Sequence, residues 1–285
     1  GDWSTPPSYL AQVEFAGEVI SFRRPWHLFQ QCGKAIAHDF KLLTEGRRTE
    51  RLSAHNTVIG DPELIFLEKG AVVEASILNT KGGPIYFGKD AEVMEGCMLR
   101  GPVAVGDRTQ LKMGAKVYGP TTFGPECRVG GEVTNSVITG FSNKGHDGFL
   151  GNSVLGEWCN LGADTNTSNL KNTYGNVQVY SAVQKGMVDT GVQFCGLLMG
   201  DHGKSGINTM FNTGTVVGVA ANVFGGGFPP KQIPGFVWGG VDGSETYDIE
   251  RALRTAQRVM ERRHIPMTVL DEALLRHVFA VEQEK

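Results

Sequence analysis

The sequence predicts a mainly β fold, a parallel β-helix of short stacked strands that lies between helical segments at the two ends of the chain. Three observations lead to this fold class. Large apolar residues recur every six residues over a long central stretch, small or β-branched residues take the fifth place of each six, and 39 of the 285 residues are glycine. A helix would instead need apolar residues every 3.6 residues and would avoid glycine.

The composition is typical of a soluble globular protein with a buried core. Charged residues make up 20% of the chain and apolar residues 40%. The net charge of −3 gives no general electrostatic case for nucleic acid or an anionic membrane as a partner. Because no run of about 18 apolar residues occurs, we expect no transmembrane helix.

Residues 1–56 precede the repeat and are expected to form a helix followed by a linker. The helix is predicted in RPWHLFQQCGKAIAHDFKLL, with Pro25 near its start. Six apolar residues fall on one face of it: Leu28, Phe29, Cys32, Ile36, Phe40 and Leu43. The charged stretch TEGRRTERLSAHN that follows is expected to be a solvated connection rather than a binding patch.

The β-helix is expected over residues 57–240, and its repeat is clearest from Phe87 onward. There the sequence divides into FGKDAE, VMEGCM, LRGPVA, VGDRTQ, LKMGAK, VYGPTT, FGPECR and VGGEVT. Eight large apolar residues in the first places have a chance probability below roughly one in a thousand. Gly88, Gly106 and Gly124 recur every 18 residues, so three hexads make one triangular coil. Stacked coils pair as parallel strands about 4.8 Å apart and share one continuous core.

The repeat changes twice, and both changes are predicted to be loops. The first lies between Val133 and Phe149 and carries His146 among glycines. The second lies between Thr165 and Met199, after which a new register runs to Phe228. Insertions in a solenoid usually map to one face, so we expect the two loops to emerge close together.

Residues 241–285 are predicted to form two helices that cover the open end or side of the coil. Ser244 or Thr246 would cap a helix that runs to about Arg263, and Pro266 would end it. The stretch Thr268–Asp271 has the pattern of a capping box for a second helix. Its apolar residues in line are Leu270, Leu274 and Val278.

The five cysteines indicate a reducing, cytoplasmic setting. None of them forms a C-x-x-C pair, and three fall on the fifth place of a hexad. A zinc or redox motif is therefore not expected. The pattern favours small buried core residues instead.

His146 suits a general base because an imidazole with a pKa near 6.5 can accept a proton at neutral pH. Transfer of an acyl group to an amine needs such a base as the amine attacks a thioester. Backbone N–H groups of a glycine-rich turn can stabilise the oxyanion that forms. The other interpretation of His146 is a turn residue without a role, and the residues alone leave both open.

The chain resembles the hexapeptide-repeat acyltransferases over about residues 57–228. Within this range, residues 140–170 resemble the C-terminal half of the bifunctional glucosamine-1-phosphate acetyltransferase / N-acetylglucosamine-1-phosphate uridylyltransferase family. The motifs that carry the resemblance are SNKGH at 142–146, FLGN at 149–152, NLGADT at 160–165 and SNL at 168–170. The resemblance implies a left-handed parallel β-helix of the hexapeptide-repeat acyltransferase superfamily, although parallel crossovers are generally right-handed. The stretch is also similar to a bacterial branch of sugar-phosphate nucleotidyltransferases.

The resemblance implies roles for nine residues of this chain. His146 matches the general base. The residues implied in substrate binding are Lys116, Glu132, Phe149, Asn160 and Asn169, and those implied in acetyl-CoA binding are Ala163, Asp201 and Val219. Four positions depart from the family pattern. Thr134 replaces a phosphate-binding lysine, and Phe149 replaces a sugar-contacting tyrosine. Asn143 replaces the loop lysine, although Lys144 is adjacent, and Lys116 lies where the family has a phosphate-binding arginine.

The function that we expect is acyl transfer, with acetyl as the expected group, from acyl-CoA to an amino sugar phosphate or nucleotide-linked sugar in a sugar-nucleotide pathway. The resemblance also implies a homotrimer. Residues 1–56 could be the tail of a nucleotidyltransferase domain that would precede residue 1, and magnesium would belong to that domain, with no metal in this chain. The alternative is a non-catalytic solenoid that holds trimers of a nucleotidyltransferase together.

Overall fold

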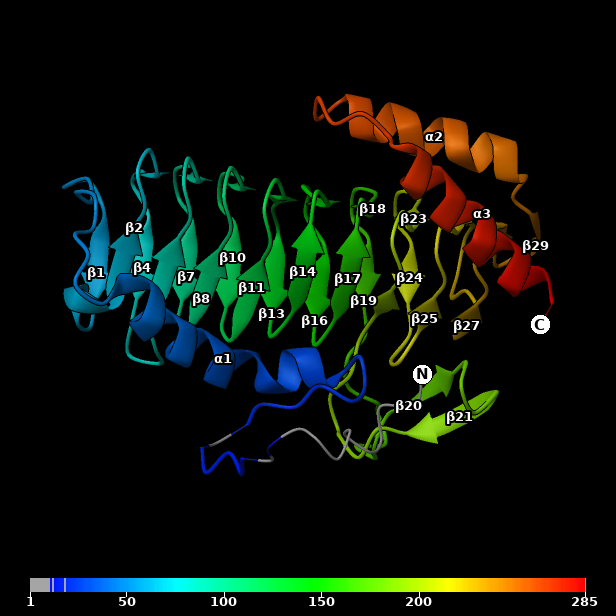
Figure 1. Ribbon diagram of the computed structural model, residues 1–285, viewed down its shortest axis with the longest axis horizontal. Helices are drawn as coiled ribbons and strands as arrows, with labels where there is room; N and C mark the ends of the chain where they lie inside the picture. Colours follow the sequence, from blue (N-terminus) through cyan, green and yellow to red (C-terminus); the bar gives the residue numbers. More distant parts are fainter. Residues whose placement is uncertain (1–10, 12, 18, 285) are drawn as a thin grey trace.

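A computed structural model describes residues 11, 13–17 and 19–284 of the chain. Figure 1 shows a long stack of short strands, with one helix along its earlier part and two helices over its later part. The turns of the coil up to β16 each contribute one strand to each of three parallel sheets, which we call sheets A, B and C, and the later turns continue sheets B and C. This architecture confirms the predicted parallel β-helix with helical flanks.

The strands of each sheet follow one another along the stack. Sheet A contains β1 (Thr57–Ile59), β4 (Ile77–Asn79), β7 (Met98–Arg100), β10 (Lys116–Tyr118), β13 (Glu132–Thr134) and β16 (Phe149–Gly151). Beside β16 lies β19 (Asn166–Thr167), which pairs with β24 (Met210–Phe211). Sheet B contains β2 (Ile65–Leu67), β5 (Ile85–Phe87), β8 (Val103–Val105), β11 (Thr121–Phe123), β14 (Val137–Gly140), β17 (Val154–Glu157), β22 (Leu198–Met199), β25 (Val216–Val217) and β27 (Gln232–Ile233).

Sheet C runs along the third side of the coil. It contains β3 (Val72–Val73), β6 (Glu92–Val93), β9 (Gln110–Leu111), β12 (Arg128–Val129), β15 (Asn143–Lys144), β18 (Asn160–Leu161), β23 (Lys204–Ser205), β26 (Asn222–Phe224) and β28 (Val237–Gly240). The last strand, β29 (Gly243–Thr246), pairs antiparallel with β28. A short 3₁₀ helix, η1 (Pro62–Leu64), precedes β2.

We name the corners by the sheets that they join, so the C–A corner links a strand of sheet C to the next strand of sheet A.

The core of the coil is built as the hexads predict. The first-place residues from Phe87 to Val129 are all buried: Phe87, Val93, Leu99, Val105, Leu111, Val117, Phe123 and Val129. The small fifth-place residues are buried as well, among them Cys97, Thr109 and Cys127. Adjacent coils are in register, since Phe87 pairs with Val105. All five cysteines are buried and free.

The first predicted loop is wrong, because the coil stays closed between Val133 and Phe149. β14 and β15 continue sheets B and C there, and the repeat is only shortened. Gly130 and Gly131 replace a longer turn, with Gly131 at φ +69°. The expected inward residue of β16 was Phe149, but the structure places its neighbour Leu150 there. Leu150 is fully buried, whereas Phe149 lies on the outer face and is half-buried.

The second predicted loop does leave the coil. Between β19 and β22 the chain forms an antiparallel hairpin of β20 (Gln178–Ser181) and β21 (Gly186–Asp189). Val177 and Val179 pack with Trp26, Phe29 and other residues on the outer side of sheet B. The insertion therefore leaves at the A–B corner, whereas His146 lies at the C–A corner. The expectation that the two segments emerge together is wrong.

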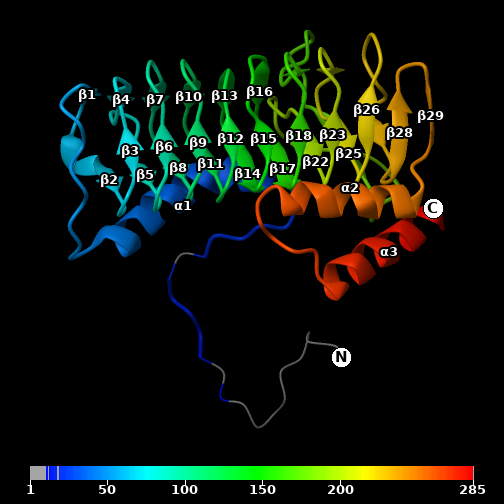
Figure 2. The same ribbon diagram turned by 90° about the horizontal axis from the view of Figure 1, so that it is seen from above.

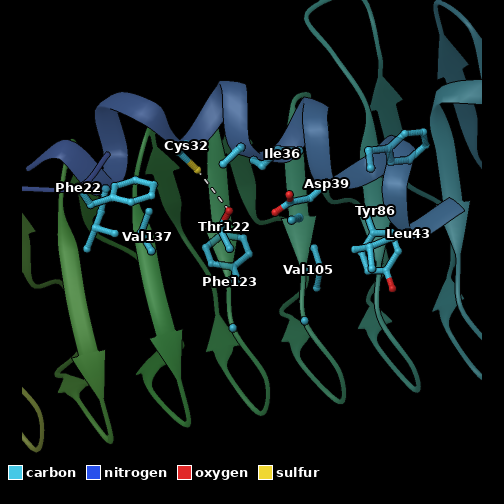
Figure 3. Close-up of a pocket in the computed structure, with 16 residues that line it drawn as sticks. Phe22, Cys32, Ile36, Asp39, Leu43, Tyr86, Val105, Thr122, Phe123 and Val137 are labelled. Atoms are coloured by element: carbon cyan, nitrogen blue, oxygen red, sulfur yellow. Dashed lines mark hydrogen bonds between the residues drawn. The ribbon is translucent and has the colours of Figure 1, made fainter. Parts of the chain in front are cut away.

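The N-terminal helix covers sheet B. α1 (His27–Thr44) buries Phe29, Cys32 and Ile36 of its predicted apolar face. Leu28 and Phe40 are half-buried, and Leu43 near the helix end is 47% exposed, which differs from the prediction. Figure 3 shows this face above the sheet, where the Cys32 Sγ lies 3.2 Å from the Thr122 Oγ1. The residues after α1 form the expected linker, in which the Arg47 Nη2 donates to the Glu68 Oε2 at 2.6 Å.

The C-terminal helices cover the later coils. α2 (Ile249–Glu261) runs along the stack, and α3 (Val269–Gln283) crosses beneath it in the view of Figure 2. The cap of α2 differs from the prediction. The expected caps Ser244 and Thr246 are part of β29, and Asp248 caps the helix instead. The Thr268–Asp271 capping box of α3 is present.

The face that α3 buries differs from the prediction. α3 buries Leu275, and Leu270 and Leu274 are exposed. Its buried side joins α2 and the B–C corner in one apolar cluster. Within the described residues, no helix has the length and apolar character that crossing a lipid bilayer would need.

Candidate functional site

The C–A corner is the part of the coil where the predicted site residues gather. His146 lies in the turn from β15 to β16 and is exposed. The next coil places Ala163 beside it, since the Asp164 N–H donates to the Asp147 carbonyl at 3.0 Å. Gly148, at φ +116°, lies directly against the Thr165 carbonyl, where a side chain would not fit. The two turns therefore stack closely, with the imidazole on the outside.

Three predicted substrate residues form one row on sheet A, next to this corner. Lys116 pairs with Glu132, and Glu132 pairs with Phe149, each as the first residue of its strand. All three side chains are half-buried and point outward from the coil. Each of them follows the C–A corner directly, so the row forms one side of the surface that carries His146.

Asn160 borders the same corner from the side of sheet C. It is the first residue of β18, three residues before Ala163, and it is exposed. The Asn143 Nδ2 donates to the Asn160 Oδ1 at 3.4 Å. His146, Ala163, Asn160 and the row on sheet A thus surround a single corner of the coil.

The other three predicted residues lie at different corners. Asn169 is at the A–B corner, where its Nδ2 donates to the Asn152 Oδ1 at 2.8 Å. Asp201 and Val219 lie one coil apart at the B–C corner, and the Ala220 N–H donates to the Asp201 carbonyl at 2.9 Å. Within one chain, the three residues implied in acetyl-CoA binding are therefore divided between two corners.

Lys144 is a residue of this corner that the sequence analysis did not assign. It takes an inward position of β15, between Val129 and Leu161 of the neighbouring coils, and only 2% of it is exposed. Its Nζ donates to the His146 carbonyl at 2.5 Å. Burial lowers the pKa of Lys144 to about 8, against the opposing attraction of Asp147 and Asp164. The signal that could have found it is a lysine where the repeat calls for an apolar residue.

The groove beneath α1 is a separate feature. It has a volume of about 390 Å³ between α1 and the outer face of sheet B, and Phe22, Ile36 and Phe123 are among its mostly apolar lining. Figure 3 shows Asp39 as the charged side chain at this groove. None of the nine predicted site residues, all of which the structure describes, lines it.

A metal site is not formed by the part of the chain that the structure describes. No group of three or more histidine, cysteine, aspartate or glutamate side chains lies close enough together to hold an ion.

The chain is similar to bifunctional GlmU proteins. It is 27% identical to the protein of Trichodesmium erythraeum over 150 residues, which are 52% of this chain and 27% of that protein. It is 24% identical to the protein of Synechococcus elongatus over 221 residues, which are 70% of this chain and 44% of that protein. With the protein of Methanocaldococcus jannaschii it shares 34% of 87 residues, 30% of this chain and 21% of that protein. The chain thus spans less than half the length of these curated relatives.

No family model matches the chain. Among solved structures, the polySia-specific acetyltransferase NeuO is similar at 11% identity and a TM-score of 0.31, covering 67% of this chain and 81% of that one. A point mutant of AntD, an N-acyltransferase from Bacillus cereus, is similar at 10% identity and a TM-score of 0.34, covering 60% and 90%.

Proposed function

We propose that the chain transfers an acyl group from an acyl-CoA to the amine of an amino sugar phosphate or a nucleotide-linked sugar at the C–A corner. One observation carries the proposal: His146 is exposed at a turn where Ala163, Asn160 and Phe149 lie around it. The similarity to bifunctional GlmU proteins supports it, because these residues fall on the motifs of that resemblance.

The proposed reaction proceeds without a covalent intermediate on the protein. The neutral amine attacks the thioester carbonyl while the imidazole of His146 takes up the proton that the amine loses. The C–N bond forms, and the negative charge on the oxygen is stabilised by backbone N–H groups of the turn. The C–S bond then breaks, and the thiolate of CoA leaves with the proton returned from His146.

The remaining corner residues would bind and orient the acceptor. Asn160 offers an amide to the hydroxyl groups of a sugar, and Lys116 offers one positive charge to a phosphate, without the two-pronged geometry of an arginine. Asp201 and Val219 lie at another corner, so they would reach the same acyl-CoA only from a second copy of the chain. A homotrimer, as the resemblance implies, would supply that copy.

The test compares His146→Ala with His277→Ala, since both histidines are exposed. Loss of the base should lower acyl transfer by about 10²–10⁴-fold, measured as release of CoA thiol with a panel of amino sugar phosphates and nucleotide-linked amino sugars. His277→Ala should keep full activity, and neither change should move the melting temperature by much, because exposed residues contribute little to the core.

A non-catalytic solenoid is the second candidate. Two observations favour it: Asn152 already holds the amide of Asn169, and Thr134 and Phe149 depart from the family pattern. If His146→Ala retains full activity on the best acceptor, or if no acceptor is acylated, the proposed enzyme is wrong and this alternative stands.

A further inference from the structure

A pocket of about 230 Å³ lies between the outer face of sheet C and the C-terminal end of α2. Its floor is formed by Asn143, Asn160 and Lys204, which are neighbours in one row of sheet C. The rings of Phe141 and Trp158 form one side and stack with their centroids 4.3 Å apart. Val259, Arg262 and Arg263 close the pocket from the side of α2 and the turn after it.

The pocket concentrates positive charge. Lys204, Arg262 and Arg263 line it, and none of its eight lining residues is acidic. The nearby carboxylate of Glu126 is already bound by Arg108 and lies 3.6 Å from the Arg128 Nη2. Burial, together with the charge of Arg128, lowers the pKa of Arg263. Like charges are therefore held together here without a carboxylate of the pocket to balance them.

Arg263 is poised to make a bond that the described residues do not supply. Its Nη2 donates to the Asn143 Oδ1 at 2.9 Å, but its Nε is buried and has no partner. An unmade hydrogen bond of a buried donor is unfavourable, and more so for a charged group. A ligand with acceptor oxygens would remove this cost.

The positive groups are not needed to cap α2. The last carbonyls of this helix already accept from the backbone: Arg262 N–H donates to Arg258, Arg263 N–H to Met260, and His264 N–H to Glu261. Lys204 donates to the His202 carbonyl at 2.9 Å and, as an ammonium with three hydrogens, can donate further. The guanidinium and ammonium groups thus remain able to bind a ligand.

We propose that this pocket binds the phosphate group of a phosphorylated small molecule, held by Lys204, Arg262 and Arg263. Arginine and lysine form short, charge-assisted hydrogen bonds to phosphate oxygens, and the guanidinium plane matches two of them at once. The volume is below the about 300–1,000 Å³ of sites that enclose a whole drug-sized ligand. The pocket therefore takes the charged end of the molecule, and the rest extends past Asn160 toward the C–A corner.

Binding can be measured without acyl transfer, so this inference is tested independently of the proposed function. Titration calorimetry of the full chain would use inorganic phosphate first, and then glucose 1-phosphate and 3′,5′-ADP at equal ionic strength. The last two distinguish a sugar phosphate from the phosphorylated nucleotide half of CoA. His146→Ala should bind inorganic phosphate as the unchanged chain does.

Two arginines of α2 and its end offer a matched pair of variants. Arg262→Gln, which removes a charge that lines the pocket, should weaken phosphate binding by about 10-fold. Arg258→Gln removes the same charge one turn earlier from an exposed position outside the pocket and should change the Kd by less than twofold. Because Arg262 is exposed, neither change should affect folding.

The inference is overturned if none of the three probes binds, or if the two variants weaken binding equally, which would indicate general charge attraction. It is also overturned if Arg262→Gln binds as tightly as the unchanged chain. Lys204→Gln, checked first for an unchanged far-ultraviolet spectrum, should repeat the loss seen with Arg262→Gln.

Discussion

Lys144 shows how strongly one residue can be constrained by its place in the coil. Its neighbours at the same inward position are Val129 and Leu161, which are apolar. The ammonium bonds the His146 carbonyl, but most of its water is lost. The pKa of about 8, against 10.5 for the free side chain, corresponds to about 3 kcal/mol against the charged form.

This shift predicts a pH dependence of stability. Between pH 8 and 10.5 the unfolded chain holds a proton on Lys144 that the folded chain has released, so the free energy of unfolding gains a contribution that rises with pH in this window. Lys144→Met, which keeps the apolar stem, should remove that contribution. Urea denaturation at pH 7, 8, 9 and 10 checks it through the difference between the two proteins. Subtraction cancels the cysteines, whose burial raises their pKa values and acts in the opposite direction.

A difference that stays constant from pH 7 to 10 would contradict the prediction. A useful control is Lys171→Met, because Lys171 is half-buried and bonds the Asn176 carbonyl outside the coil. That change should leave the pH dependence of the free energy of unfolding as it is in the unchanged chain.

Counting by six predicted the buried residues well and the outer residues less well. The first-place residues from Phe87 to Val129 are buried as expected, because every side chain that points into a triangular coil packs in its single core. The count then fails at Gly130 and Gly131, where a turn loses residues. The next turn, between Val133 and Ile138, is also one residue shorter than six, so Leu150 rather than Phe149 points inward and the expected loop is a closed coil. A hexad count cannot detect a shortened turn, since only the backbone of the neighbouring coils determines where the chain can bend.

At the scale of elements, the B–C corner carries an aromatic ladder that the repeat did not predict. Phe141, Trp158 and His202 occupy the same turn position in successive coils, all at φ between +51° and +61°. Trp158 stacks on Phe141 with centroids 4.3 Å apart and on His202 at 6.2 Å. The apolar cluster beneath α2 and α3 continues this corner, so the ladder helps to seat the C-terminal helices.

His202 is the polar member of this ladder. Its Nδ1 is buried without a partner, and burial together with Lys204 lowers its pKa to about 4. As the pH falls from 6.5 to about 4, the unfolded chain binds a proton that the folded chain does not, so the histidine lowers the stability of the protein in acid.

His202→Phe should therefore stabilise the chain, by about 1 kcal/mol at pH 7 from loss of the unpaired nitrogen and by about 2–3 kcal/mol more near pH 4. The ring should keep the stack, because Phe141 and Phe236 already adopt the same positive φ. Urea denaturation at pH 7, 5.5 and 4 measures the gain, with His277→Phe on the exposed side of α3 as the control. An equal gain at all three pH values would contradict the role of burial.

The flanking elements were predicted as helices, but their ends were not. The cap of α3 was read correctly because both partners of its box lie within four residues. The start of α2 was missed because residues 243–246 first pair with β28. Such a return strand depends on an open sheet edge that the local sequence does not show.

At the scale of the whole molecule, the three sides of the coil differ in whether helices cover them. α1 covers sheet B, and α2 and α3 cover the later coils beside sheet C. The outer face of sheet A exposes apolar side chains instead: Ile59, Ile77, Met98 and Tyr118 are 37–45% exposed. They line a hollow of about 200 Å³ together with Lys116, next to the row that carries Glu132 and Phe149.

This open face supports the homotrimer that the resemblance implies. A neighbouring copy on sheet A would cover the apolar residues, and closed cyclic assemblies are the usual form of homo-oligomers. Light scattering at micromolar concentration should therefore report a mass of three times 30.8 kDa.

Met98→Glu places a charge in the middle of this face and should shift the mass toward that of one chain, with a matching loss of acyl transfer if the site is shared between copies. Leu270→Glu is the control, because Leu270 is 81% exposed on α3 and away from sheet A. If the unchanged chain already has the mass of a monomer, the trimer is wrong. If Leu270→Glu dissociates the assembly and Met98→Glu does not, the copies meet through α3, and His146 would then have to work with the residues of its own chain alone.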